Sequence, residues 1–267
     1  MQVEFQELYL SPIEKELRFN QWCQQNNIEL FLFDLDDTIC RTKENFWEQL
    51  DKLAKLLHQN SPNTSIDEWK AIVNETNNRF YQTEGVNPKR RFSVITDLTN
   101  RFSLPENIQQ QSLNLLSQIY TTPLQWLPGA QDGLNFVRAH TPIGVVTHAN
   151  RGWTWQKYQW LGLAEYLPWD HVYVVNENGQ KTAESWQQSI KYFGQEAKNC
   201  AIVGDSPKSD INPTHTIGVK HRFFVHNGPI WTTQQQEVPS DTHHINNLLE
   251  ISNIGLNSLA SLPATRH

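Results

Sequence analysis

The chain has 267 residues, 38% of them hydrophobic and 19% charged, a composition that supports a packed core and argues against wholesale disorder. Its length fits one large domain, or a core domain with a smaller one attached. The formal net charge is −6, and Lys and Arg are scattered apart from "PKRR" at residues 88–91, so we expect no nucleic-acid partner.

Three features of the sequence bear on the cellular compartment of the protein, namely its cysteines, its first residues and its apolar runs. Cys23, Cys40 and Cys200 are far apart and lack CxxC spacing, so we expect neither a disulfide framework nor a zinc site. The opening "MQVEFQELYL" does not combine a basic start with a long apolar run, as a signal peptide does. No apolar run approaches the length of a membrane span. We therefore expect a cytoplasmic protein with no membrane partner.

A helix is expected over residues 11–26. Ser11 can cap its N-terminus, Pro12 suits the first helical position, and Glu14 completes a capping box with Ser11. The following run at 28–34, "IELFLFD", is apolar and rich in branched and aromatic residues, which predicts a buried strand.

This predicted strand runs directly into a cluster of acids. Asp34, Asp36 and Asp37 occupy three of four consecutive positions, and Thr38 follows them. Like charges at this spacing repel one another, so the cluster needs a neutralising partner. Asp37 is expected to be a loop or capping residue rather than a catalyst.

Residues 42–122 have a different character from the rest of the chain. Apolar residues recur at three- and four-residue spacing in the segments 43–59, 65–84 and 105–120. No convincing strand interrupts them. We therefore expect residues 41–122 to form a helical domain inserted into the core.

From residue 123 onward, helices and strands alternate. Helices are expected at 127–140, 152–167 and 182–194, and strands at 142–149, 171–177, 199–206 and 218–226. This alternation predicts an α/β fold with a doubly wound parallel sheet, a Rossmann-like core built from residues 1–40 and 123–251. A short helix at 244–252 and a tail at 252–267 are expected at the periphery.

Polar residues follow the predicted strands at their carboxyl ends, where ligands gather in open parallel sheets. In chain order they are Asp34 and Asp36 after the first strand, Thr147 at the end of the second, Lys181 past the third, and Asp205 and Asp210 at and beyond the fourth. Asp34, Asp36 and Asp205 could share a hard divalent cation, and carboxylate oxygens suit Mg²⁺. Such an ion would also relieve the repulsion within the acidic cluster.

These residues and their order resemble the motifs of the haloacid dehalogenase superfamily, in particular its phosphohydrolases with a helical cap. Asp34-Leu35-Asp36-Asp37-Thr38 fits the first motif, DxDx(T/V), and "GVVTHAN" at Thr147 fits the second. "QKTAESW" at Lys181 fits the third, and "VGDSPKSD" at Asp205 and Asp210 fits the fourth. The third motif often has Pro after the lysine, where this chain has Thr182, which puts the start of that helix in question. The resemblance covers residues 28–226.

The resemblance implies a role for each matched position. Asp34 would attack the phosphorus of a phosphoester to give an aspartyl-phosphate, and Asp36 would protonate the leaving alcohol and then activate water. Thr147 would hydrogen-bond the transferring phosphoryl group, and Lys181 would neutralise charge on Asp34 and the phosphate. The implied Mg²⁺ ligands are Asp34, the backbone carbonyl of Asp36 and Asp205, with Asp210 as a further ligand or an orienting residue.

Other polar residues are candidates for contact with the substrate. His148, Asn150 and Arg151 directly follow Thr147 and should lie near the mouth of the site. Arg151 could grip a phosphate or carboxylate, or it could have a structural role at the surface. The basic residues of "PKRR", which are Lys89, Arg90 and Arg91, are expected to form a solvated face rather than to contact substrate.

The function expected from the resemblance is that of a Mg²⁺-dependent phosphatase. It would hydrolyse a small phosphorylated metabolite through an aspartyl-phosphate, with the helical insert closing over the site and selecting the substrate. Two alternatives remain open, namely a phosphomutase of the same family and a non-catalytic regulatory protein on the same scaffold. The presence of Asp36 favours phosphate chemistry over dehalogenation, because the family's dehalogenases lack that second acid. The substrate and the oligomeric state are left unspecified.

Overall fold

The computed structural model describes residues 11–175, 180–228 and 235–254. Its described strands form one six-stranded sheet in the order β3-β2-β1-β4-β5-β6, and every neighbouring pair is parallel. The strands are β1 Leu30–Phe33, β2 Ile143–Thr147, β3 Val172–Val174, β4 Cys200–Gly204, β5 His221–Val225 and β6 His243–Ile245. The predicted doubly wound parallel sheet is confirmed.

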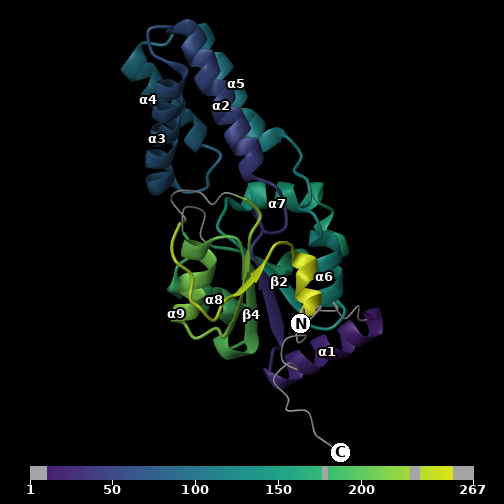
Figure 1. Ribbon diagram of the computed structural model, residues 1–267. Coiled ribbons are helices and arrows are strands. Elements are labelled where there is room, and N and C mark those ends of the chain that lie inside the picture. The colour runs from purple at the N-terminus through teal and green to yellow at the C-terminus, as the bar shows by residue number, and fades with distance from the viewer. Residues whose placement is uncertain (1–10, 176–179, 229–234, 255–267) are drawn as a thin grey trace, which may run out of the picture.

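The central strand β1 is buried on both faces. Phe31 and Phe33 point into a core formed with α1 (Pro12–Gln25) and α6 (Ala130–Arg138). Leu30 and Leu32 point into a second core formed with α8 (Ala183–Tyr192), beside which α9 (Asn212–Thr216) packs. Successive side chains of a strand alternate between faces, so a strand covered by helices on both sides must be apolar throughout. Figure 1 shows the two helix layers on either side of the sheet.

The starts of two helices follow from their sequences. Ser11 and Glu14 form the expected capping box at the start of α1. Thr182, the residue after Lys181, caps α8 in a reciprocal pair with Ser185. Threonine is a good N-cap because its hydroxyl accepts a hydrogen bond from an otherwise unpaired backbone N–H. The position of Lys181 just before this helix is therefore well defined.

Residues 43–121 form four helices between β1 and β2, which we call the inserted module. They are α2 Lys43–Asn60, α3 Ile66–Glu84, α4 Arg90–Phe102 and α5 Glu106–Thr121. The sequence prediction found the segments of α2, α3 and α5 but not that of α4. Buried Val94, Ile95 and Leu98 join α4 to the core of the module. Two of those three are β-branched residues, which weaken a helical signal.

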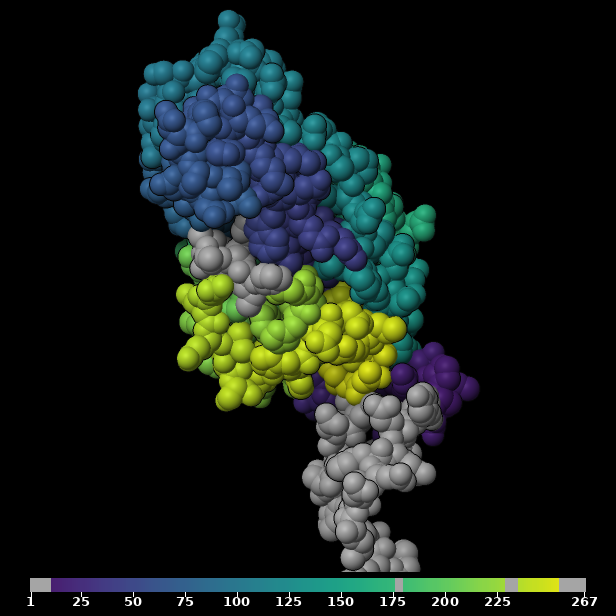
Figure 2. All heavy atoms as spheres, turned by 45° about the horizontal axis from the view of Figure 1, so that its top comes forward, coloured from purple at the N-terminus to yellow at the C-terminus, as the bar shows by residue number. Residues whose placement is uncertain are grey.

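The inserted module packs against the core at the carboxyl ends of the strands. Helix α7 (Arg151–Trp160) belongs to the core in sequence, yet its Trp153 packs into the hydrophobic cluster of the module. Figure 1 shows α7 between the module and the sheet, and Figure 2 shows the atoms of the module, blue to teal, stacked on the green and yellow core.

The C-terminal part differs from the prediction. His243–Ile245, which overlaps the first two residues of the helix expected at 244–252, instead forms the edge strand β6 by pairing with Phe223–Val225 of β5. The helix that follows is a 3-10 helix at Leu248–Asn253, which packs against α6. The expected tail at 252–267 and the end of the strand expected at 171–177 lie largely outside the described residues.

Short helical turns complete the described structure. Leu163–Glu165, Trp169–His171 and Ala197–Asn199 are 3-10 helices, and Pro207–Ile211 is a π-helical turn. The three cysteines are free, in agreement with the prediction of no disulfide framework, and all three are buried. Within the described ranges, no helix has the length and apolar character needed to cross a lipid bilayer.

Candidate active site

A cavity of about 110 Å³ lies between the carboxyl ends of the strands and the inserted module. The core lines it with acids and bases, namely Asp34, Asp36, Asp37, His148, Lys181, Asp205 and Asp210. The module lines it with Phe46, Asn77, Asn78, Tyr81, Val86 and Arg90. The two sides differ in chemistry, because the core side is densely charged and the module side is mostly aromatic and amide.

Asp34 lies at the end of β1, held by the sheet and by its own loop. Its backbone N–H donates to the carbonyl oxygen of Val203 at 2.8 Å, which continues the pairing of β1 with β4. Its carboxylate accepts a hydrogen bond from the hydroxyl of Thr38 at 3.2 Å and forms an ion pair with Lys181. These contacts fix the orientation of a buried carboxylate.

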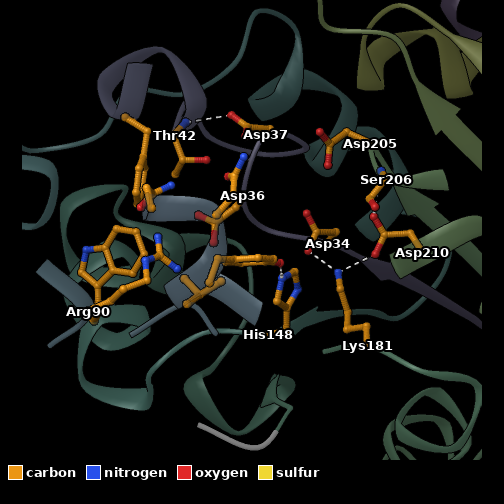
Figure 3. Close-up of a pocket in the computed structure, with 16 residues that line it drawn as sticks. Asp34, Asp36, Asp37, Thr42, Arg90, His148, Lys181, Asp205, Ser206 and Asp210 are labelled. Carbon is orange, nitrogen blue, oxygen red and sulfur yellow. Dashed lines mark hydrogen bonds and ion pairs between the residues drawn. The ribbon is translucent and has the colours of Figure 1, made fainter. Parts of the chain in front are cut away.

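Lys181 joins two of the acids. It is buried, and its ammonium group pairs with Asp34 and lies 2.5 Å from Oδ1 of Asp210 (Figure 3). It also donates to the carbonyl oxygen of Val146 at 3.3 Å, next to Thr147. Burial alone would lower the pKa of Lys181, but the carboxylates of Asp210 and Asp34 outweigh burial and raise it above its usual range. The side chain therefore carries a permanent positive charge at Asp34.

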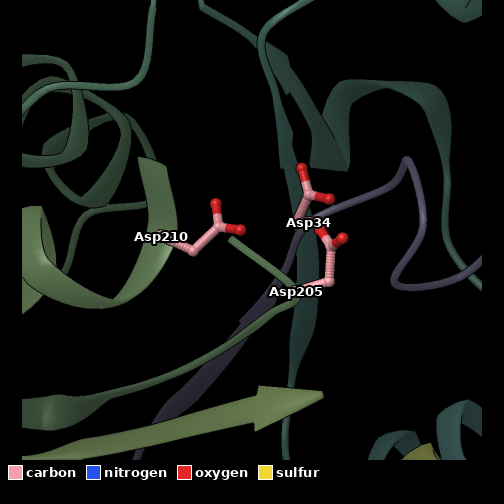
Figure 4. A group of neighbouring side chains, drawn as sticks. All are labelled: Asp34, Asp205 and Asp210. Atoms are coloured by element: carbon pink, nitrogen blue, oxygen red, sulfur yellow. The ribbon is translucent and has the colours of Figure 1, made fainter. Parts of the chain in front are cut away.

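Asp34, Asp205 and Asp210 converge on one point (Figure 4). One oxygen from each carboxylate lies within 4.8 Å of the others. Burial and the neighbouring carboxylates of Asp37 and Asp34 raise the pKa of Asp205 well above its ordinary value. Burial raises the pKa of Asp210 to about 7, although Lys181 opposes the shift. Three buried carboxylates with this much mutual repulsion make a hard-oxygen donor set that suits a divalent cation such as Mg²⁺.

Gly204, the last residue of β4, makes room for Asp210. A Cβ atom at this position would lie 2.4 Å from Oδ2 of Asp210. Asp210 also accepts a hydrogen bond from the backbone N–H of Ser206 at 3.0 Å, so its carboxylate is held between Ser206 and Lys181. The glycine of the "GD" pair is therefore required by close packing against the acid five residues after Asp205.

Asp36 faces the cavity and pairs with a lysine that the sequence analysis did not select. Lys157 of α7 lies 2.7 and 2.6 Å from the two carboxylate oxygens of Asp36. Lys157 is fully buried. The signal for it was present in the sequence, because Lys157 falls between Trp153 and Leu161 at four-residue spacing, on the apolar face of the predicted helix. A lysine on such a face indicates a buried ion pair.

Asp37 has a structural role that matches its expected one. Its Oδ1 accepts hydrogen bonds from the backbone N–H groups of Thr42 and Lys43, both at 2.9 Å, at the start of α2. Its backbone is left-handed, with φ of 60°, a conformation that Asp tolerates better than most residues. Asp37 therefore caps the first helix of the inserted module.

The residues after β2 divide into those that line the cavity and those that do not. Thr147 is buried at the end of β2, and only His148 among the four candidates is one of the described residues lining the cavity. The Nε2 of His148 lies 3.2 Å from the hydroxyl of Tyr81, and burial together with Lys181 lowers the pKa of His148 to about 3, so its ring is neutral near pH 7.

Neither Asn150 nor Arg151 lines the cavity. The side chain of Asn150 accepts a hydrogen bond from the backbone N–H of Trp153 and caps α7. The guanidinium of Arg151 is exposed and lies 5.5 Å from the ring centroid of Trp169. In this structure both have structural contacts, which favours the surface alternative for Arg151.

Arg90 departs most from expectation. The sequence placed it on a solvated face, whereas the structure buries it at 4% exposure and puts it in the cavity lining. The prediction was wrong because Arg90 begins α4, the helix that the sequence pattern did not reveal. Its neighbour Arg91 does not line the cavity and donates to the carbonyl oxygen of Pro88 at 2.6 Å.

Comparison with known proteins gives matches over most of the chain. The family model for haloacid dehalogenase-like hydrolases matches residues 28–213. Two curated relatives are named glyceraldehyde 3-phosphate phosphatase. The one from Pyrococcus abyssi is 26% identical over 74% of this chain and 81% of its own length, and the one from Pyrococcus furiosus is 24% identical over 74% and 80%.

A solved structure shares the fold. It is a haloacid dehalogenase-like family hydrolase from Xanthomonas campestris, with a TM-score of 0.70 and 16% sequence identity. The match covers 87% of this chain and 92% of that one. At this identity the match shows a shared fold.

Proposed function

Because this chain belongs to the haloacid dehalogenase-like hydrolases, we propose that it is a Mg²⁺-dependent phosphatase that hydrolyses a small phosphomonoester through a phosphorylated Asp34. The observation that carries the proposal is the position of Asp34. Its carboxylate is buried at the floor of the cavity, paired with Lys181, hydrogen-bonded to Thr38 and adjacent to Asp205 and Asp210. A carboxylate held in this way is suited to attack an electrophile that arrives with its own negative charge.

The first step forms an acyl phosphate. A carboxylate oxygen of Asp34 forms a bond to phosphorus, and the bond between phosphorus and the ester oxygen breaks. Asp36, which faces the same cavity, gives its proton to the departing alkoxide and releases an alcohol. Lys181 offsets negative charge on the phosphoryl oxygens and on Asp34.

The second step regenerates the enzyme. Asp36, now a carboxylate, takes a proton from a water molecule as the water oxygen attacks phosphorus, and the bond between phosphorus and Asp34 breaks. Inorganic phosphate leaves, and both acids return to their starting protonation states. Hydrogen bonding from Lys157 holds Asp36 in reach of the reacting oxygen in both steps.

We also propose roles for the Mg²⁺ ligands and for Thr147. Asp34 and Asp205, with the backbone carbonyl of Asp36, would hold Mg²⁺, and Asp210 would either complete the ligand set or orient Lys181. When bound, the ion supplies positive charge that stabilises the oxygens of the transferring phosphoryl group. Thr147 would hydrogen-bond that group from the end of β2, a proposal supported by its position next to the carbonyl of Val146 that binds Lys181.

The cavity favours a small substrate. Its volume of about 110 Å³ and its enclosure between core and module suit a metabolite rather than a polymer. The inserted module would exclude water from the acyl phosphate and select the alcohol part of the ester. The names of the two curated relatives make glyceraldehyde 3-phosphate the first ester to try.

The test is a phosphate-release screen over sugar phosphates, nucleotides, phosphoglycolate and three-carbon phosphates, with Mg²⁺ and with EDTA. We expect release that requires Mg²⁺ and that Asp34→Asn abolishes. Movement of phosphate to a second hydroxyl without release would identify the phosphomutase alternative. Inactivity of the wild type towards every ester in Mg²⁺ would favour the non-catalytic alternative.

A further inference from the structure

Arg90 is a buried cation that has no acidic partner among the residues the structure describes. The other buried cations in the described residues each form an ion pair with a carboxylate, and they are Lys43, Lys157, Lys181 and Arg222. Arg90 is 4% exposed, and no described Asp or Glu lies within ion-pair distance of it. Burial of an unpaired charge is costly, so proteins compensate nearly every such group.

The contacts of Arg90 position it but do not neutralise it. One guanidinium nitrogen donates to the carbonyl oxygen of Gly85. The guanidinium lies 5.3 Å from the ring centroid of Tyr81 and 5.8 Å from that of Phe46. Aromatic rings attract a cation weakly and hold its plane, while the remaining N–H donors of arginine stay available for a planar or tetrahedral anion. The side chain is therefore oriented for an anionic ligand that the described residues do not provide.

Arg90 lies at the opposite side of the cavity from the phosphoryl chemistry. Figure 3 shows Arg90 on the module side and Lys181, Asp205 and Asp210 on the far side, with Asp36 and His148 between them. Tyr81 of the cavity lining reaches from one end towards the other, because its ring lies beside Arg90 and its hydroxyl lies 3.2 Å from Nε2 of His148. A ligand whose phosphate occupied the Asp34 end would extend its other end towards Arg90.

We propose that Arg90 binds a second anionic group of the substrate, so that the preferred substrate is a small phosphomonoester that also bears a carboxylate or a second phosphate. This inference rests on the proposed function, since it assumes that the first phosphate is bound at Asp34. It narrows the substrate class, because it ranks phosphorylated acids and bisphosphates above neutral sugar, alcohol or aldehyde phosphates of the same length.

A matched series of esters tests the inference on the wild-type enzyme. 3-Phosphoglycerate, glyceraldehyde 3-phosphate and glycerol 3-phosphate share the phosphate and the three-carbon chain and differ in having a carboxylate, an aldehyde or an alcohol at the other end. Because hydrogen bonds to a charged group are the stronger kind, we expect kcat/KM for the carboxylate to exceed that for the alcohol by about 10- to 100-fold. A bisphosphate of glycerol in the same series distinguishes a second phosphate from a carboxylate.

A pair of variants assigns that preference to Arg90. Arg90→Gln should lower kcat/KM for the anionic ester by about 10- to 100-fold, mainly through KM, and leave the alcohol ester nearly unchanged. Arg91→Gln makes the same chemical change at the next position of the same helix, outside the cavity lining, and should alter neither. A purely structural role for Arg90 would instead lower activity towards all esters together.

The outcomes separate this inference from the proposed function. An active wild type with equal kcat/KM for the carboxylate, bisphosphate and alcohol esters overturns the inference and leaves the phosphatase standing. No phosphate release from any ester overturns both. If Arg90→Gln fails to fold, the wild-type series still decides, because a preference for neutral esters would contradict an anion site.

Discussion

The ammonium group of Lys157 lies 2.6 Å from Oδ2 of Asp36, and this ion pair joins helix α7 to the loop that follows β1. The Asp36 side chain keeps 24% of its exposure and faces the cavity, whereas Lys157 is completely buried. The same nitrogen lies 4.1 Å from the ring centroid of Trp153, which packs into the inserted module. The proposed acid/base, Asp36, is thus linked through Lys157 of the core to Trp153, which packs against the inserted module.

The Asp36–Lys157 pair predicts a specific pattern of stabilities. Lys157→Met removes the partner of a half-buried carboxylate and should lower the free energy of unfolding by about 1–3 kcal/mol. The double variant with Asp36→Asn removes both charges and should lose less than the sum of the two single changes. Urea denaturation of the four proteins measures the coupling. Simple additivity would show that the pair has no energetic role.

The same variant separates positioning from binding. Lys157→Met should lower kcat and leave KM little changed, because Asp36 acts on the reacting oxygen and Lys157 acts through Asp36. Steady-state kinetics on the best ester, at saturating Mg²⁺, gives both constants. A fall in kcat/KM that came from KM alone would contradict the positioning role.

Gly204→Ala is predicted to damage the metal site through sterics. The new methyl would lie 2.4 Å from Oδ2 of Asp210 and must displace that carboxylate. We expect a loss of about 1–3 kcal/mol in the free energy of unfolding, and a weaker response of the melting temperature to added Mg²⁺.

Gly133→Ala is the matched control for that change. Its added methyl would lie 2.5 Å from the backbone carbon of Leu248 and would contact none of the three acids of the cluster. It should lower stability by a similar amount while the Mg²⁺ response stays as in the wild type. If the melting temperatures of both variants respond to Mg²⁺ equally, the close packing of Gly204 on Asp210 does not determine how the acidic cluster binds Mg²⁺.

The response to Mg²⁺ should strengthen as pH rises. Burial raises the pKa of Asp205 and of Asp210, the latter to about 7, so the metal-free folded protein holds protons there that the unfolded chain has released. Stability from this source is present at low pH and is lost as pH rises through the raised pKa values. Mg²⁺ must displace those protons, so its affinity increases over the same window.

Melting temperatures with and without Mg²⁺ at several pH values measure this effect. The difference between the two curves is the relevant quantity, because His148 contributes in the opposite sense. Burial lowers its pKa to about 3, so its contribution to stability is lost as pH falls below its ordinary value. A Mg²⁺-induced increase that grew towards acid pH would contradict the assignment of these carboxylates to the metal.

Asp37 is predicted to matter for stability more than for turnover. Asp37→Ala removes the acceptor for two backbone N–H groups at the start of α2 and should cost about 1–2 kcal/mol in unfolding free energy. Asp37→Asn retains an acceptor oxygen and tolerates the left-handed backbone, so it should cost much less. Kinetics of Asp37→Asn should show far more residual activity than Asp36→Asn, and equal losses would give Asp37 a chemical role.

Much of the fold could be predicted because its signals are local. The apolar run before Asp34, the capping box at Ser11 and the alternation of helices and strands after residue 123 each depend on neighbouring residues. Helix α4 and strand β6 were missed because their local signals are weak. The few apolar residues of α4 are partly β-branched, and His243–Ile245 becomes a strand only through its pairing with β5.

The residues of the site also divide into those that local sequence predicts and those whose place depends on packing. Asp34, Asp36, Lys181, Asp205 and Asp210 could be predicted because each follows a strand whose end is set by the parallel sheet. Lys157 and Arg90 lie on helices, and their place in the site depends on how those helices pack against the core. The sequence placed Lys157 on the apolar face of its helix, but its partner Asp36 and the burial of Arg90 emerged only from the structure.

The central claim is that Asp34 carries the phosphoryl group. Rapid acid quenching of the enzyme during turnover of a radiolabelled phosphate ester in Mg²⁺, followed by borohydride reduction and peptide mass spectrometry, tests it most directly. The account predicts protein-bound label in the wild type, its absence in Asp34→Asn, and reduction of Asp34 to homoserine. Wild-type turnover by Asp34→Asn, or label on another residue, would contradict it.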